Sequence, residues 1–188
     1  MGNLKIYTIV FVLTSILFSK KTEAQCFTKL DESPHDIVYY RSSKVSLPEV
    51  KVIYGRPDAK DETVFGTQIP YGKIWRTGSN EATEIKFYQD IMFGNKFVKA
   101  GTYALYTIPN KNYWTIILNK KTDTYGAFFY NPEDDIAKIT VPAGEGAMME
   151  HFTIAFTSRE YGSQMVLAWA KTRIRVPLYT EANLLSKI

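Results

Sequence analysis

Short apolar runs alternate with turn-forming residues along most of the chain. From residue 50 onward, Gly, Pro, Asn and Asp separate these runs. Such spacing is typical of successive strands, because an amphipathic helix shows longer segments with a period of 3.6 residues. We predict strands at 50–54, 73–76, 83–88, 91–93, 96–98, 102–108, 113–118, 127–130, 136–141, 150–156, 165–171 and 173–178.

The turns between these segments favour antiparallel pairing. Gly94 and Asn95 separate two apolar segments, and both residues tolerate the positive φ of a two-residue hairpin. A second hairpin is predicted at 109–112, and longer surface loops at 142–146 and 158–163. Roughly ten short strands with turns about 8 to 12 residues apart predict an all-β fold, an antiparallel β-sandwich or jelly-roll-like domain.

The alternation within each strand predicts which side chains face the core. Segments 102–108 and 113–118 are apolar on both faces, which favours central strands covered on both sides. In 150–156, the period of two residues places Glu150 on the same face as Phe152 and Ile154. A carboxylate on an apolar face needs a partner, so we expect Glu150 to be paired.

The N-terminal residues have the layout of a secretory signal. Lys5 precedes an apolar and small-residue run at 6–18, polar residues follow, and Ala24 ends a candidate cleavage site. The run has 13 residues, whereas a helix needs about 17 to 25 to cross a bilayer, so no permanent membrane span is predicted. We expect the mature chain to begin at Gln25 and to be exported, either periplasmic or secreted.

Cys26 is the sole cysteine, so it cannot form an internal disulfide bond. It is either an inert thiol near the mature N-terminus or the acceptor of a lipid anchor. Bacterial lipoprotein signals place a leucine and two small residues before that cysteine, and Glu23, Ala24 and Gln25 stand there instead. Lipid anchoring is therefore the less favoured alternative.

Composition and charge narrow the class of protein. Hydrophobic residues make up 45% of the chain, which predicts a packed core in a single domain. Residues 1–24 contain three lysines and one glutamate, so 20 basic and 18 acidic residues remain after cleavage. The basic residues form no run, and nucleic acid is therefore not a predicted partner. The predicted organisation is a signal peptide (1–24), an N-terminal wrapping segment (25–48), a β-sandwich domain (49–179) and a C-terminal tail (180–188).

Several kinds of site can be set aside. A Ser-His-Asp hydrolase needs a nucleophile elbow, which is absent, and the two histidines, His35 and His151, are predicted to be surface residues. Two histidines and one cysteine do not form a metal cluster. The acidic turn at 131–135 fits no calcium loop, and no glycine motif for phosphate is present. We predict no metal and no cofactor.

The densest polar segment is 69–84, and it contains the candidate ligand-binding residues Tyr71, Trp75, Arg76, Asn80 and Glu81. Aromatic rings combined with a guanidinium, an amide and carboxylates bind sugars, peptides and other polar organic ligands. The same groups can instead form a structural network. In that alternative Arg76 pairs with Glu81 or with Glu150, and its loss would destabilise the fold.

At this segment the chain resembles a known family. The residues are PYGKIWRTGSNEAT at 70–83, AGTYALYTIP at 100–109 and WTIILN at 114–119. Together they resemble the pattern of the domain-of-unknown-function family 2911, over about 33–178. Ser79 and Tyr125 depart from the usual alanine and tryptophan. The resemblance implies an exported β-rich domain of the bacterial envelope, and it implies no catalytic residues.

Three hypotheses about function remain open at this stage. The first is a non-catalytic binding or structural module of the envelope with a small polar ligand or an envelope component as partner. The alternative is a hydrolase of polar envelope or carbohydrate material, with a carboxylate such as Glu81 acting beside Arg76. The third is a protein-interaction domain, which would show an exposed apolar patch or strand edge.

Overall fold

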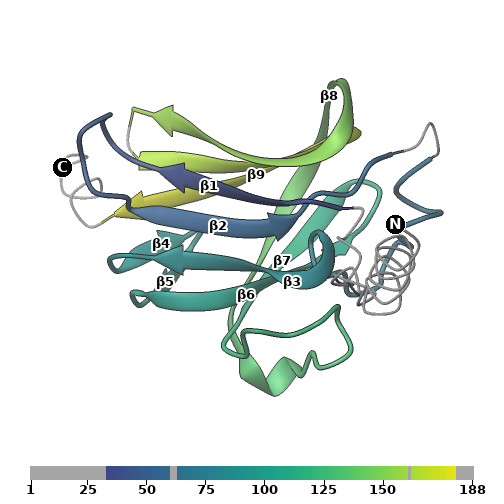
Figure 1. Ribbon diagram of the computed structural model, residues 1–188, viewed down its shortest axis with the longest axis horizontal. Coiled ribbons are helices and arrows are strands. Elements are labelled where there is room, and N and C mark those ends of the chain that lie inside the picture. Colours follow the sequence, from purple (N-terminus) through teal and green to yellow (C-terminus); the bar gives the residue numbers. More distant parts are fainter. Residues whose placement is uncertain (1–32, 60–62, 161, 181–188) are drawn as a thin grey trace, which may run out of the picture. The chain divides into compact units, whose positions relative to one another are not determined.

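The described part of the chain forms one antiparallel sheet. The computed structural model describes residues 33–59, 63–160 and 162–180. Their nine strands are β1 (His35–Tyr40), β2 (Val50–Gly55), β3 (Ser79–Phe87), β4 (Ile91–Phe93), β5 (Lys96–Val98), β6 (Gly101–Pro109), β7 (Tyr113–Asn119), β8 (Asp135–Arg159) and β9 (Gly162–Thr180). The strand order is β1-β2-β3-β6-β7-β8-β9-β4-β5 (Figure 1). An all-β antiparallel fold is thus confirmed, whereas the sheet is not closed and the finer sandwich or jelly-roll architecture stays a prediction.

The longest strand, β8, connects the two parts of the sheet. Its first residues pair with β7, and its pairing with β9 begins at Ala143. The segment 142–146 was predicted as a loop, but it continues the strand. The pairing register shifts twice, between Glu145 and Met149 and again before Thr153. Bulges of this kind bend a strand, so the predicted strands 136–141 and 150–156 form one bent element.

Three other predictions differ from the structure. Segment 73–76 is not a strand, because only Trp75 forms an isolated bridge, with Thr107. Segment 127–130 is also not a strand and belongs to the loop between β7 and the 3₁₀ turn η1 (Pro132–Asp134). Conversely, β1 lies inside the segment expected to wrap the domain and pairs with β2 at an edge of the sheet.

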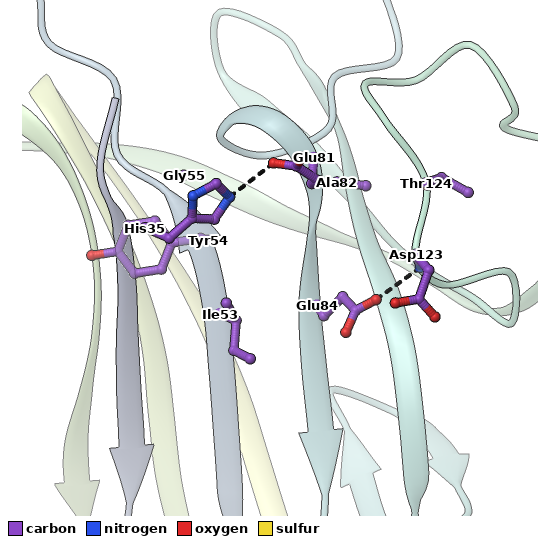
Figure 2. Close-up of a pocket in the computed structure, with 9 residues that line it drawn as sticks. All are labelled: His35, Ile53, Tyr54, Gly55, Glu81, Ala82, Glu84, Asp123 and Thr124. Atoms are coloured by element: carbon purple, nitrogen blue, oxygen red, sulfur yellow. Dashed lines mark hydrogen bonds and ion pairs between the residues drawn. The ribbon is translucent and has the colours of Figure 1, made fainter. Parts of the chain in front are cut away.

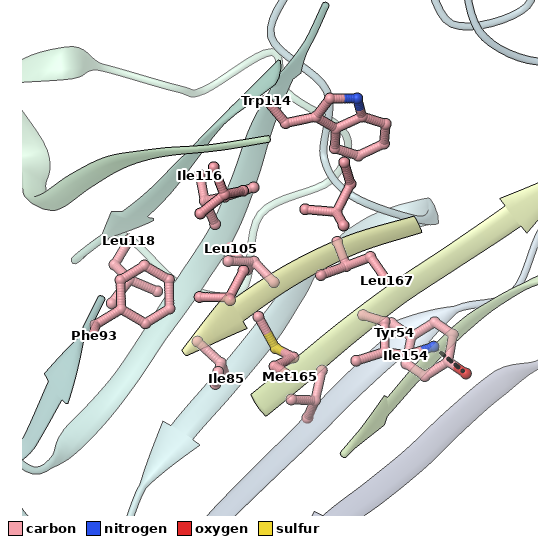
Figure 3. Packing of buried hydrophobic residues seen from close by; sticks show 14 of the residues in the cluster. Tyr54, Ile85, Phe93, Leu105, Trp114, Ile116, Leu118, Ile154, Met165 and Leu167 are labelled. Atoms are coloured by element: carbon pink, nitrogen blue, oxygen red, sulfur yellow. Dashed lines mark hydrogen bonds between the residues drawn. The ribbon is translucent and has the colours of Figure 1, made fainter. Parts of the chain in front are cut away.

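The main core contains side chains from strands that are far apart in the strand order of the sheet. Figure 3 shows Trp114, Leu105 and Ile85 facing Met165 and Leu167 of β9. Aromatic pairs join the same regions: Tyr54 and Phe152 have ring centroids 5.6 Å apart, and Trp75 stacks on Trp169 at 5.9 Å. Residues of β2 and of the segment before β3 therefore contact β8 and β9 through the core.

A smaller cluster covers the opposite face of the same strands. Ala82 of β3, Ala104 and Tyr106 of β6 and Ile117 of β7 are buried there. Partly buried side chains from other segments pack against this smaller cluster, among them those of Ile74, Ala127 and Tyr130. The strands at 102–108 and 113–118 are thus apolar on both faces because both faces are covered, as the sequence predicts.

Some predictions fall outside the described residues. The signal peptide, Cys26 and the C-terminal residues 181–188 are among these. Within the described ranges, no helix has the length and apolar character required to cross a bilayer.

Two tyrosines, the buried Tyr54 and the partly buried Tyr130, predict a loss of stability at alkaline pH. Burial raises the pKa of Tyr130, and a 2.9 Å hydrogen bond that it donates to Asp135 raises it further. Burial also raises the pKa of Tyr54. Because the folded state favours the neutral phenols, these tyrosines contribute to the free energy of unfolding. The contribution is complete below a pH of about 10, the unfolded-state pKa. It is lost as the pH rises through the folded-state pKa. Melting curves between pH 8 and 11.5 should therefore show a falling melting temperature above pH 10.

The variant Tyr130→Phe checks this explanation. At pH 8 it should be less stable by about 1 kcal/mol, because one hydrogen bond is lost. Above pH 10 its melting temperature should fall less steeply than that of the natural protein. Parallel curves for the two proteins would contradict a role of Tyr130 in the alkaline transition.

Candidate functional site

A pocket of about 170 Å³ lies where β1, β2 and β3 meet the loop after β7. Figure 2 shows its lining, which comes from four separate segments of the chain. The lining residues are His35, Ile53, Tyr54, Gly55, Glu81, Ala82, Glu84, Asp123 and Thr124. Ala82 also belongs to the smaller cluster, so the pocket opens on the face of β3 away from the main core.

The pocket forms because the pairing of β3 with β2 is interrupted over a few residues. Ile53 pairs with Glu84, but Gly55 pairs with Ser79, so β3 has three more residues than β2 between these points. We call residues 80–83 the bulge. Its residues pair with the loop after β7 instead: Ala82 N donates to Thr124 O at 2.8 Å, and Gly126 N donates to Asn80 O at 2.9 Å. The pocket is the space between β2 and the bulge.

Gly55 is required where the two strands come together again. A Cβ atom on Gly55 would lie 2.1 Å from the carbonyl oxygen of Ser79. No real Cβ makes so close a contact with backbone, so only glycine permits this approach. Gly55 and Ala82 also leave the floor of the pocket without large side chains.

Charged groups stand on two sides of the pocket. His35 Nε2 lies 3.0 Å from Glu81 Oε2, and the two side chains are 36% and 53% exposed. On the other side, Glu84 Oε1 accepts a 2.8 Å hydrogen bond from the backbone N–H of Asp123. Asp123 has a φ of 56°, a conformation that Asn and Asp tolerate better than most residues. The walls therefore carry three carboxylates and one histidine, which can accept hydrogen bonds from hydroxyl or ammonium groups.

The candidate residues from the sequence lie in different environments. Glu81 lines the pocket, and Asn80 precedes it in the bulge. Trp75 is only 5% exposed and packs in the main core, where its Nε1 donates to Gly78 O at 3.1 Å. Tyr71 is exposed but does not line the pocket. Trp75 therefore supports the fold under the site, and Glu81 is the predicted residue that borders the cavity.

The structural alternative in which Arg76 forms a buried pair with Glu150 is wrong, because Glu150 is not buried. Glu150 is exposed, because the irregular pairing of β8 between Met149 and Thr153 changes the alternation of its side chains. The other proposed partner, Glu81, is paired with His35. Arg76 is partly buried, and its Nε is a buried donor without a hydrogen-bond acceptor.

Sequence reasoning missed three of the charged pocket residues: His35, Glu84 and Asp123. His35 begins a strand whose apolar and aromatic residues, Ile37 to Tyr40, were a usable signal for β1. Glu84 lies in β3, but its hydrogen-bond partner Asp123 comes from a loop almost forty positions later in the chain. Nothing local to the sequence indicates that contact.

Exposed aromatic side chains lie next to the pocket. Tyr125 forms an isolated bridge with Glu81 and is 57% exposed, and Phe128 is 81% exposed. Their rings are nearly parallel, at 4°, with centroids 6.4 Å apart. The loop that lines one side of the pocket with Asp123 and Thr124 thus also carries exposed aromatic rings.

The other polar clusters are weaker candidates for a functional site. Within the described ranges, no group of three or more His, Cys, Asp or Glu residues could hold a metal ion. In the acidic turn, Asp134 pairs with Lys120 at 3.0 Å and Asp135 with Lys138 at 3.3 Å. These carboxylates are already neutralised by lysines, so the pocket remains the strongest candidate site.

The fold and the pocket define a class of protein: an antiparallel β-rich domain with a small carboxylate-lined pocket on one face of its sheet. Residues 33–178 match the model of a family described as a protein of unknown function, DUF2911. The match covers most of the chain, so the chain belongs to this family and the resemblance seen in the sequence is confirmed. Neither the search of curated proteins nor that of solved structures finds a match.

Proposed function

We propose that this chain is an exported, non-catalytic binding module of the bacterial envelope and that its pocket takes a small hydroxylated ligand, such as one unit of a carbohydrate. One observation carries the proposal: Glu81, Glu84 and Asp123 line a cavity, and the loop that contributes Asp123 also carries the exposed rings of Tyr125 and Phe128. Carboxylates accept hydrogen bonds from hydroxyl groups, and aromatic rings stack on the apolar face of a sugar.

The size of the pocket limits the ligand. Its volume of about 170 Å³ is below the roughly 300 to 1,000 Å³ of typical small-molecule sites. A single ring, or the end of a longer chain, is therefore the expected occupant. The aromatic rings on the loop would contact the part of the ligand that remains outside.

The finer architecture belongs to the same proposal. The contacts of Tyr54 with Phe152 and of Trp75 with Trp169 join distant parts of the sheet across one core. These contacts support a β-sandwich, whose outer face would then carry the pocket.

A hydrolase receives less support from this geometry. A general acid of the glycosidase type usually sits among apolar side chains, which keep it protonated. Glu81 is instead half exposed, and its Oε2 lies 3.0 Å from His35 Nε2. We therefore favour binding over catalysis.

Calorimetric titration of the purified protein with a panel of neutral sugars, uronic acids and amino sugars tests the proposal. At least one member should bind, and Glu84→Gln should weaken its binding about tenfold, because one charged hydrogen-bond acceptor is lost. Glu145→Gln, at an exposed carboxylate of β8 that does not line the pocket, is the matched control and should bind normally. The proposal fails if no member binds, or if both variants bind as the natural protein does.

A further inference from the structure

The buried polar atoms without hydrogen-bond partners belong to residues that are close in the chain or in the strand pairing. Over the described residues, four buried side-chain atoms make no hydrogen bond: Arg56 Nε, Arg76 Nε, Ser79 Oγ and Asn80 Nδ2. The strand pairing joins these residues, because Gly55, next to Arg56, is the partner of Ser79. Folded proteins satisfy nearly all their buried polar groups, so these exceptions are candidate contacts for a bound group.

Arg76 is the most informative of the four residues. Its Nε is fully buried, and its guanidinium makes neither an ion pair nor a hydrogen bond to any described residue. A partly buried cation without a counter-charge is costly to the fold. Arg56 differs, because its Nη1 lies 3.2 Å from Asp36 Oδ2. Of these two arginines, Arg76 is therefore the one available to pair with a negatively charged group of a ligand.

Ser79 and Asn80 supply further hydrogen-bonding groups within four residues of Arg76. Ser79 is only 7% exposed, and its Oγ has no partner. Asn80 has a φ of 59°, and its backbone carbonyl is held by Gly126 N. The backbone of this segment is thus fixed, while its side-chain amide and hydroxyl remain unused.

The chemistry of these groups defines what is missing. A guanidinium and an amide N–H₂ are donors, and a serine hydroxyl can also donate, so the absent partner must supply acceptor oxygens and negative charge. Carboxylate, phosphate and sulfate groups match a planar guanidinium especially well. Glu81, a carboxylate five positions after Arg76, lies 3.0 Å from His35 and is not an ion-pair partner of Arg76.

We propose that Arg76, Ser79 and Asn80 form an anion-binding subsite at the end of the pocket, which holds the carboxylate, phosphate or sulfate group of an acidic ligand. Gly55 and Glu81, the neighbours of this subsite in the sheet and in the chain, line the pocket itself. The inference rests on the proposed function only for the remainder of the ligand, which would occupy the pocket. An acidic sugar would use both parts.

Free anions test the subsite without any knowledge of the whole ligand. Acetate, inorganic phosphate and sulfate are titrated against the purified protein at constant ionic strength, with chloride as reference, and binding is followed by calorimetry and by thermal melting. At least one anion should bind saturably and raise the melting temperature. A stronger response to acetate assigns a carboxylate ligand, and a stronger response to phosphate or sulfate assigns an ester of that kind.

Three variants locate the binding. Arg76→Met and Asn80→Asp should each weaken anion binding at least tenfold; aspartate tolerates the positive φ at position 80 while it replaces the amide with a repelling charge. Arg76→Lys should show an intermediate loss, because lysine keeps the charge without the planar fork. Arg175→Met, at an exposed arginine of β9, is the matched control and should bind anions normally.

Stability separates this proposal from a structural role of Arg76. Without anions, Arg76→Met should melt within about 2 °C of the natural protein, because no ion pair is lost. A fall of about 6 °C or more would assign Arg76 to the fold and overturn the subsite. Equal anion binding by Arg76→Met and Arg175→Met, or no saturable binding of any anion, would also overturn it. Glu84→Gln should bind anions as the natural protein does. A failure of the sugar titration alone would therefore contradict the proposed function and leave the anion subsite standing.

Discussion

Replacing Trp75 with alanine is expected to lower the melting temperature by about 6 to 20 °C. Trp75 is buried and packs against Trp169, Trp114 and Phe152. Removing a buried tryptophan costs about 3 to 5 kcal/mol, because the lost contacts leave a cavity that the surroundings fill only in part. Each kcal/mol moves the melting temperature of a domain of this size by roughly 2 to 4 °C.

Tyr71 provides the comparison for this prediction. It lies four positions earlier in the same polar segment, but its side chain is exposed. Tyr71→Ala should change the free energy of unfolding by about 1 kcal/mol or less, as for most surface substitutions. Thermal melts of the two variants are the measurement, and similar shifts for both would show that the core does not depend on Trp75.

Gly55→Ala should also destabilise the protein, by about 1 to 3 kcal/mol or more. The added methyl group would lie 2.1 Å from the carbonyl oxygen of Ser79, and neither backbone can move away without breaking the pairing of β2 with β3. The expected fall in melting temperature is about 2 to 12 °C. The same strain should distort the pocket floor and weaken binding of any ligand found for the natural protein.

Gly144→Ala is the matched control for this substitution. A Cβ atom on Gly144 would have its nearest neighbour at 3.6 Å, an ordinary van der Waals contact, and its φ is not positive. This variant should melt within about 2 °C of the natural protein. Equal losses in the two variants would mean that the close approach at Gly55 does not hold the strands together.

The part of the fold that depends on local pattern could be predicted from the sequence. The Gly94-Asn95 hairpin is present, with Phe93 paired to Lys96 and a φ of 60° at Gly94. The central strands β6 and β7 were identified because a strand covered on both faces must be apolar on both. At these positions the neighbouring residues in the sequence are sufficient to determine the local structure.

Predictions failed where a distant contact decides the outcome. The side of β8 on which Glu150 lies depends on bulges in its pairing with β9, which shift the alternation that the sequence displays. The strand β1 starts with His35 and Asp36, and this polar beginning hid an edge strand that is stabilised by pairing with β2 and by packing of Val38 and Tyr40 on the core. An alternation with a period of two residues is the pattern of a regular strand, and it does not indicate where a bulge interrupts that strand.

The candidate site was predictable only in part for the same reason. Asn80 and Glu81 stand in a dense polar segment and could be singled out. Their role at the pocket depends on the bulge, and the bulge exists because residues 124–126 replace β2 as its partner. His35, Glu84 and Asp123 meet there from three separate parts of the chain.

The position of β4 and β5 has a consequence for the order of folding. Their hairpin forms locally, but its place in the sheet is against β9, where Ile91 pairs with Thr180 and Phe93 with Leu178. Contacts between residues so far apart in sequence carry a large loop-closure entropy and slow the folding of β proteins. The hairpin therefore waits for the last strand, and a chain that lacks residues 162–180 would leave β4 with no neighbour except β5. Until its C-terminal strand is available, the polypeptide therefore cannot complete its sheet.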